Sequence, residues 1–177
     1  MTPAHLISSP LGDIAIRIEE DALTGLFFVG QKYYPPLAIA PDANARNASP
    51  LVRKVAEEVA EYFTGTRERF SVPIQLRGTA FQRSVWAQLL AIPFGELASY
   101  GDITARVGLP MSAARAVGGA VGRNPVSIMV PCHRVIGASG SLTGYAGGIE
   151  RKRALLSLEG AGFRRGARHP AQQALAF

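Results

Sequence analysis

The chain has 177 residues, 47% of them hydrophobic, and its 19 Lys and Arg exceed its 13 Asp and Glu by a net charge of +6. This composition excludes a disordered polyelectrolyte and predicts one large or two small domains with a hydrophobic core. The single cysteine, Cys132, excludes an intramolecular disulfide and a multi-cysteine zinc site, and favours a reducing compartment. No apolar run reaches the roughly 18 residues that cross a bilayer, and the N-terminus does not resemble a signal peptide, so we expect a cytoplasmic protein with no membrane partner.

The charge is divided unevenly along the chain. Residues 1–77 carry 8 Lys and Arg against 9 Asp and Glu, a net charge of −1, whereas residues 78–177 carry 11 against 4, a net charge of +7. A localised positive half is typical of proteins that bind nucleic acid, but solvated surface charge explains it equally well. We expect domains at 1–77 and 78–163, and a basic tail at 164–177 that is either a disordered DNA-binding extension or simply solvated.

The N-terminal half predicts a small antiparallel sheet with one helix. Ser49 precedes Pro50 and predicts a helix that runs to about Thr64. The stretch 30–48 lacks periodicity, and we expect a loop there. Alternating apolar residues between turn-forming residues predict strands at 5–8, 12–18 and 23–29, and a further strand at 70–76.

The second half predicts mostly helices. Thr79 is a capping residue for a helix in which Phe81, Val85, Leu89 and Ile92 recur at helical spacing. Residues 99–102 have the form of a capping box and begin a short helix that ends at Gly108, and a second short helix follows at about 112–121. Two short helices joined by a glycine-containing turn indicate a helix-turn-helix, although many ordinary helix pairs share the pattern.

The second of these helices has almost no side-chain bulk except at Arg115. Its two glycines each cost about 1 kcal/mol relative to alanine, and something must compensate for that loss. One explanation is close packing against another helix. The other is contact with the minor groove of B-DNA, which is about 6 Å wide, because the major groove of about 12 Å would not require small residues. The small residues are Ala113, Ala114, Ala116, Gly118 and Gly119.

An apolar run further along the chain leads into Pro131, Cys132, His133 and Arg134. A free thiol has a pKa near 8.5, and an adjacent imidazole and cation could raise the thiolate fraction. Each residue alone is more typical of a structural role: a buried small hydrophobe, a hydrogen-bonded histidine and an ion-pair partner. Their combination indicates a nucleophile.

These motifs resemble the O6-alkylguanine-DNA alkyltransferase family of bacterial type. The resemblance covers about Gly78 to Gly160, whereas the N-terminal half matches only in general character. It implies an α/β fold with a ribonuclease H-like N-terminal domain and a mostly helical C-terminal domain with a helix-turn-helix. The residues that carry the resemblance are Arg115 to Gly119, Asn124 and Pro125, Pro131 to Val135, and Gly144 to Gly148.

The resemblance implies a DNA repair protein that flips O6-alkylguanine out of duplex DNA and transfers the alkyl group irreversibly to its own cysteine, in a single turnover. Whether O4-alkylthymine is a second substrate is left open. The implied partner is double-stranded DNA bound through the minor groove by a monomer, with clustering on DNA left open. No cofactor is implied. Some relatives bind zinc in the N-terminal domain through cysteines and histidines, and this chain has no cysteine there, so we expect no metal.

The resemblance also assigns roles to residues. Cys132 is the alkyl acceptor, and His133 is its base through a bound water, which suits adjacent residues in the strand expected here because they cannot easily face each other. Glu159 orients His133, Asn124 braces the preceding turn, and Tyr100 contacts the flipped base and donates a proton to the leaving guanine. Arg115 replaces the departed base in the stack. The small residues 113, 114, 116, 118 and 119 and Tyr100 contact DNA, and the substrate pocket contains Val135, Tyr145, Ala146 and Gly147.

One departure and three rival functions stay open. The chain has one residue more than the usual spacing between Tyr100 and Arg115, which could shift how the second helix meets DNA. A cysteine hydrolase would turn over repeatedly, a noncatalytic alkyl-base binder would lack a reactive thiol, and a helix-turn-helix regulator would show strong sequence preference. The repair function instead predicts binding that falls with salt and depends little on sequence.

Overall fold

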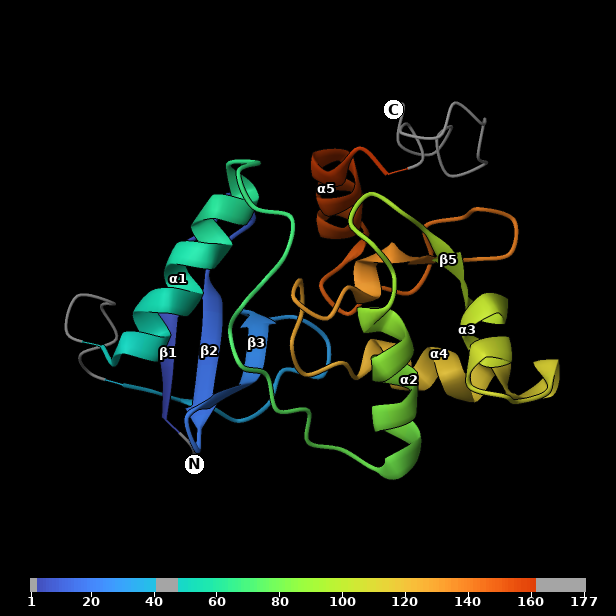
Figure 1. The fold of residues 1–177 in the computed structure, drawn as a ribbon, viewed down its shortest axis with the longest axis horizontal. Coiled ribbons are helices and arrows are strands. Elements are labelled where there is room, and N and C mark those ends of the chain that lie inside the picture. Colours follow the sequence, from blue (N-terminus) through green and yellow to red (C-terminus); the bar gives the residue numbers. More distant parts are fainter. Residues whose placement is uncertain (1–2, 41–47, 162–177) are drawn as a thin grey trace. The chain divides into compact units, whose positions relative to one another are not determined.

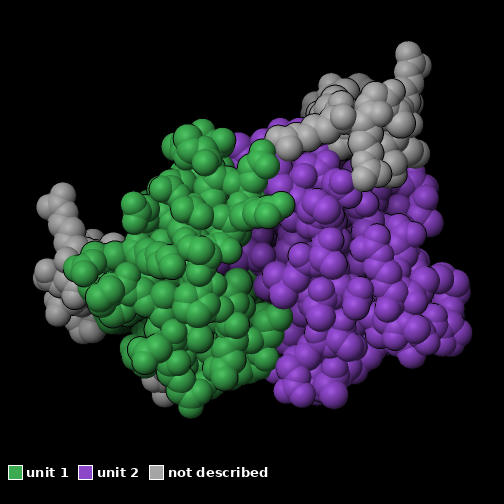
Figure 2. Space-filling model, viewed as in Figure 1, with its two compact units in different colours: residues 1–77, 125–127 green, residues 78–124, 128–177 purple. Residues whose placement is uncertain are grey.

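The computed structural model describes residues 3–40 and 48–161, which form two compact units (Figures 1 and 2). The first unit extends to Arg77 and also includes Pro125–Ser127, and the second contains the rest of the chain from Gly78. The first unit carries a small sheet and one long helix, and the second is mostly helical. This confirms the predicted α/β class. The basic tail expected at 164–177 lies outside the described residues.

The first unit is built on a four-stranded sheet in the order β3-β2-β1-β4. The β1/β2 and β2/β3 pairs are antiparallel, as predicted, and β4 runs parallel to β1. The prediction of a loop at 30–48 is therefore wrong at residues 38 and 39. These two residues pair with the edge of β1, and such pairing with a distant strand leaves no periodic pattern in the sequence. The strands are β1 (Pro3–Ile7), β2 (Ile14–Glu19), β3 (Ala22–Phe28) and β4 (Ala38–Ile39).

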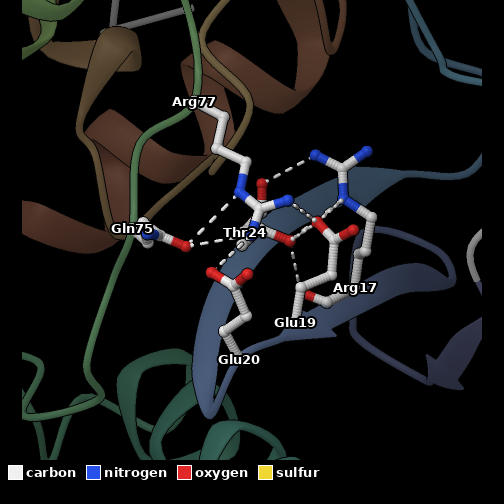
Figure 3. A network of polar contacts seen from close by, with 6 residues as sticks. All are labelled: Arg17, Glu19, Glu20, Thr24, Gln75 and Arg77. Atoms are coloured by element: carbon white, nitrogen blue, oxygen red, sulfur yellow. Dashed lines mark hydrogen bonds and ion pairs between the residues drawn. The ribbon is translucent and has the colours of Figure 1, made fainter.

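A two-residue turn joins β2 to β3. Glu20 and Asp21 both have positive φ, 50° and 58°, as in the turns whose twist matches that of a β-hairpin. Around the hairpin, Arg17 donates to the hydroxyl and carbonyl of Thr24 at 3.1 and 2.9 Å, and Thr24 donates to Glu19 at 2.8 Å. Figure 3 shows Arg77 reaching the same group, with ion pairs of 3.2 Å to Glu19 and 3.0 Å to Glu20. The network thus holds the end of the first unit's main segment against the hairpin.

The strand predicted at 70–76 does not form. Only Ile74 bridges to β3, where Leu23 N donates to Pro73 O at 2.8 Å and Gln75 N donates to Leu23 O at 3.0 Å. Pro73 has no N–H to extend a ladder, so the pairing stops at one bridge. Further along the same edge, Leu26 N donates to Pro125 O and Leu26 O accepts from Ser127 N, both at 2.9 Å.

Helix α1 (Pro50–Phe63) packs on the sheet and confirms the predicted helix, with Ser49 as its N-cap. Its buried face presents Val52, Val55, Val59 and Tyr62 to the core, as amphipathic spacing requires. Glu58 is also buried, and its carboxylate accepts hydrogen bonds from the backbone N–H and the hydroxyl of Ser71. These bonds fix the chain that returns from α1 toward β3.

The second unit contains the predicted helix-turn-helix. Thr79 caps α2 (Ala80–Leu90), as predicted, and also forms a capping box with Gln82 that was not predicted. The predicted capping box at Ser99 begins α3 (Tyr100–Arg106). Val85, Leu89 and Ile92 are buried as expected, whereas Phe81 on the same spacing is 36% exposed. The remaining elements are α4 (Ala114–Gly122), α5 (Ile149–Glu159), and the parallel pair β5 (Ala98–Ser99) and β6 (Val135–Ile136).

Two local predictions in this unit are wrong. The second helix of the pair does not begin at Ser112: Met111–Ala113 form a 3-10 turn after Pro110, and the α-helix starts at Ala114. The expected strand at Cys132 is also absent, because Cys132–Arg134 form a 3-10 turn. Pro131 cannot donate to a strand ladder, and its carbonyl accepts from Arg134 N at 3.0 Å instead. No helix in the described ranges is long and apolar enough to cross a membrane.

Candidate active site

Cys132 is buried, with 5% of its surface exposed, at the start of the 3-10 turn. The side-chain amide of Asn124 donates to Cys132 Sγ at 3.1 Å and to Val130 O at 2.7 Å. Asn124 therefore ties the end of α4 to the turn that carries the thiol. Burial raises the pKa of Cys132, although the hydrogen bond from Asn124 and the positive charge of Lys152 act in the opposite direction.

His133, Arg134 and Glu159 form a buried cluster directly after Cys132 in the 3-10 turn and on α5. His133 Nε2 lies 2.7 Å from Glu159 Oε1, and Arg134 binds both oxygens of the same carboxylate at 2.8 and 3.0 Å. Arg134 also donates to Ile92 O at 2.6 Å, and Gly95 N donates to Glu159 at 3.3 Å. The carboxylate thus faces two side chains from the 3-10 turn although it belongs to α5, 25 and 26 residues away.

The protonation states follow from this geometry. Burial alone would raise the pKa of Glu159, but His133 and the Arg134 guanidinium outweigh it and hold the pKa well below its usual range. Burial lowers the pKa of His133 and outweighs the opposite effect of Glu159. A neutral His133 donates its Nε2 proton to the carboxylate, which leaves Nδ1 as an acceptor. That Nδ1 is buried and has no hydrogen-bond partner among the described residues, so it can serve as a base.

Lys152 is a site residue that the sequence did not predict. It is fully buried on α5, and its ammonium donates to Val135 O and, at 3.2 Å, to Thr143 O. Burial lowers the pKa of Lys152 to about 8, against a smaller opposite effect of Cys132. In the sequence it looks like part of a solvated charged run, but Lys152, Leu155, Leu156 and Glu159 share one helical face. That spacing was the signal that could have identified it.

Tyr100 begins α3 and reaches the glycine-rich loop. Its hydroxyl donates to two backbone carbonyls, Thr143 O at 3.2 Å and Gly144 O at 3.1 Å. Burial raises the pKa of Tyr100, and the negative charge of a Cys132 thiolate raises it further. The phenol therefore keeps its proton and remains a donor close to the thiol.

The predicted pocket residues lie around this loop. Val135 and Tyr145 are buried, Ala146 is half-buried, and Gly147 is buried against the Tyr145 ring. A Cβ on Gly147 would lie 2.5 Å from that ring, so the close approach requires glycine. The carbonyl oxygen of Val135, a residue of the pocket that the resemblance implies, already accepts from Lys152 and keeps one further lone pair.

Helix α4 packs against α2 and α3 (Figure 1). It also carries a face of small residues that is exposed or half-buried. Arg115 and Ala116 are exposed, and Ala113, Ala114, Gly118 and Gly119 are half-buried. A Cβ on Gly118 would meet the Tyr100 ring at 3.7 Å, an ordinary contact, and one on Gly119 would meet only the end of the Arg123 side chain at 3.4 Å. Packing inside the described part of the chain therefore does not require glycine at position 118 or 119.

No group of three or more metal-ligating side chains occurs in residues 3–40 and 48–161. The cluster around Cys132 offers one thiol, one imidazole already paired with a carboxylate, and a buried ammonium. This chemistry suits a nucleophile with its own base.

The comparisons with known proteins identify the family. Residues 80–161 match the 6-O-methylguanine DNA methyltransferase DNA binding domain, and residues 4–76 match the ribonuclease-like domain of the same family. The chain is 49% identical over 154 residues to the methylated-DNA–protein-cysteine methyltransferase of Mycobacterium tuberculosis, which covers 86% of this chain and 89% of that protein. The chain belongs to the 6-O-methylguanine DNA methyltransferase family.

Other relatives agree with this assignment. The constitutive methylated-DNA–protein-cysteine methyltransferase of Bacillus subtilis is 44% identical over 152 residues, 85% of this chain and 91% of that protein. A crystal structure of Mycobacterium tuberculosis OGT in complex with DNA is 46% identical, covers 89% of this chain and 93% of that chain, and superposes with a TM-score of 0.79. Family membership confirms the resemblance seen in the sequence, including its ribonuclease-like N-terminal domain.

Proposed function

We propose that this chain, a DNA repair methyltransferase by family, uses Cys132 as the acceptor of the methyl group of O6-methylguanine. The observation that carries the proposal is the buried thiol held by Asn124 beside a neutral His133 whose Nδ1 is unengaged by the described residues. A hydrogen-bonded thiol next to an available base is the arrangement that nucleophilic catalysis requires.

The reaction is a single displacement. His133 Nδ1 takes the thiol proton through one water, and the positive charge of Lys152 stabilises the thiolate that results. The sulfur attacks the methyl carbon, the S–C bond forms as the C–O6 bond breaks, and the electron pair leaves with guanine. Tyr100, held by its hydrogen bond to Gly144 O, donates a proton to the leaving base. The proton that the thiol gave to His133 then reprotonates Tyr100. The thioether is stable, so each molecule reacts once.

DNA is the partner, and we propose that α4 enters its minor groove. The small, exposed face of α4 fits a narrow groove, and Arg115 is the large side chain that projects from it. Arg115 would occupy the space that the flipped nucleotide leaves in the stack. The extruded base would enter the pocket formed by Val135, Tyr145, Ala146 and Gly147. Extrusion of a base costs a few kcal/mol.

Intact mass spectrometry tests the acceptor assignment. After incubation with a duplex that contains O6-methylguanine, we expect one methyl mass increment per chain, located on the peptide that contains Cys132. The increment should not exceed one when the duplex is in excess, because no step regenerates the thiol. Turnover of several lesions per chain would instead indicate a hydrolase.

Replacing Gly119 by alanine tests the groove proposal through two opposite effects. Alanine should raise the free energy of unfolding by about 0.5 to 1 kcal/mol, because glycine is costly in a helix and a Cβ has room here. The same Cβ should weaken binding to duplex DNA by about tenfold, which is about 1.4 kcal/mol, because it projects into the groove. Thermal denaturation and titration of a labelled duplex measure the two effects.

A matched control is Gly65→Ser, in the first unit after α1, where φ is +79° and no DNA contact is proposed. That variant should lower stability, because the left-handed conformation favours glycine, and leave duplex affinity unchanged. A stabilised Gly119→Ala protein that binds duplex as tightly as the wild type would contradict the groove contact.

A further inference from the structure

A hollow of about 620 Å³ lies between α2 and α4, on one flank of the exposed face of α4. Gly118 lies on the other flank, toward the Tyr100 ring. Figure 1 shows α2 and α4 side by side, and the indole of Trp86 joins them by donating to Ala120 O at 2.9 Å. Helix α4 lines the hollow with Arg115, Ala116, Gly119 and Ala120, and its C-cap Arg123 and the preceding 3-10 residue Ser112 also line it. Helix α2 contributes Phe81 and Gln82, together with its N-cap Thr79.

The lining combines positive charge with an exposed aromatic ring. Arg115 and Arg123 are both exposed and no acidic residue lines the hollow, so its charge complements a polyanion. Phe81 is 36% exposed although its helical spacing matches a core position. Arg123 ends α4, and its NH1 donates to Gly119 O at 3.2 Å, which places the guanidinium along the rim of the same face.

A helix inserted in a groove of duplex DNA has one sugar-phosphate backbone on each side. Tyr100, on the other flank, donates to Gly144 O in the glycine-rich loop, next to the residues 145–147 that receive the base in the proposed function. We therefore place the lesion-bearing strand on the flank that carries Tyr100. The hollow on the opposite flank then faces the other backbone.

We propose that this hollow binds the sugar-phosphate backbone of the undamaged strand, with Arg123 contacting a phosphate and Phe81 packing against a deoxyribose. The proposal rests on the groove-binding function above and assigns its second strand. It implies that the protein holds the intact strand in place while the damaged nucleotide leaves the stack. Arg123 and Phe81 are therefore positioning residues for reaction on duplex DNA and have no part in the chemistry at sulfur.

Duplexes with uncharged methylphosphonate linkages in one strand only provide the test. Arg123→Ala should weaken binding to the ordinary lesion duplex by about tenfold and reduce the salt slope by about one, as expected for one lost phosphate contact. When the undamaged strand carries the uncharged linkages, wild type and variant should bind alike. Phe81→Ala should weaken duplex binding without changing the salt slope. Arg53→Ala, which removes an exposed charge from α1, is the control and should bind as the wild type does.

Single-stranded substrate separates this proposal from the proposed function. Methyl transfer from a single-stranded O6-methylguanine oligonucleotide should be unchanged in Arg123→Ala and Phe81→Ala, because no second strand is present. If the wild type fails to react with any lesion, the acceptor assignment is wrong. If the wild type reacts, two results would overturn the proposal. The first is that Arg123→Ala binds the lesion duplex as tightly as the wild type does. The second is that the binding defect of Arg123→Ala disappears only when the lesion strand, and not the undamaged strand, carries the uncharged linkages. The proposal is also overturned, without any variant, if uncharged linkages in the undamaged strand leave the affinity of the wild type for the duplex unchanged.

Discussion

Replacing Cys132 by alanine should abolish methyl transfer completely while the protein still binds lesion-containing duplex. The sequence contains no other cysteine, so no second thiol can accept the group. The DNA-contacting face proposed on α4 does not include Cys132, and removal of a small buried side chain at one turn should leave α4 folded. Mass spectrometry after incubation with O6-methylguanine duplex measures transfer, and gel mobility shift of the same duplex measures binding.

Cys132→Ser is the matched control for this experiment. It keeps a hydrogen-bonding atom for the amide of Asn124, yet a hydroxyl is far harder to ionise than a thiol and should also fail to react. Methyl transfer by either variant at the wild-type rate would exclude Cys132 as the acceptor. Loss of duplex binding in both variants, with normal thermal denaturation, would show that the thiol contributes to recognition as well.

Replacing Glu159 by glutamine should have the largest effect on stability, a loss of about 3 to 5 kcal/mol, because it leaves the buried Arg134 without its carboxylate. The side chain keeps nearly the same shape, so the loss reports charge and not packing. Methyl transfer should also slow, because the His133 tautomer that exposes Nδ1 depends on a carboxylate acceptor at Nε2. Urea denaturation and single-turnover kinetics at a temperature where the variant is folded measure these effects.

The effect of Glu159→Gln should also depend on pH with a defined sign. The pKa of Glu159 is lowered in the folded protein, so its stabilisation is complete above the unfolded value of about 4.3 and declines as the pH falls below it. The difference in unfolding free energy between wild type and variant should therefore shrink on acidification. Glu150→Gln, on the exposed side of the same helix, should change stability by less than about 1 kcal/mol. Equal losses at positions 150 and 159 would contradict the buried cluster.

The sequence located the features that depend on near neighbours. The cap at Thr79, the capping box at Ser99 and the helix after Ser49 form where they were predicted, because a cap is satisfied within three or four residues. The strands of the first unit also follow from alternation. The predictions that failed, at 38–39 and 70–76, concern backbone whose pairing depends on a distant strand edge.

The site shows the same division. The motif at Cys132 and His133 indicated a nucleophile, and the family resemblance added Glu159 as the partner of His133. The contact of His133 with Glu159 is present in the fold. Lys152 was missed because it looks like part of a solvated charged run, although it shares one helical face with the buried Leu155 and Glu159. The 3-10 turn at Cys132 was missed as well, since the apolar run before it suits either a strand or a buried loop.

By itself, the sequence determined the family, the order of the elements and the candidate nucleophile, because local hydrogen bonding, periodicity and motif spacing are properties of adjacent residues. Only the tertiary structure decided that the buried ammonium of Lys152 interacts with the thiol, that Arg134 and His133 share one carboxylate, and that Gly118 and Gly119 are not needed for packing. Those features depend on desolvation and on charges brought together from distant segments, and both arise only when the chain is folded.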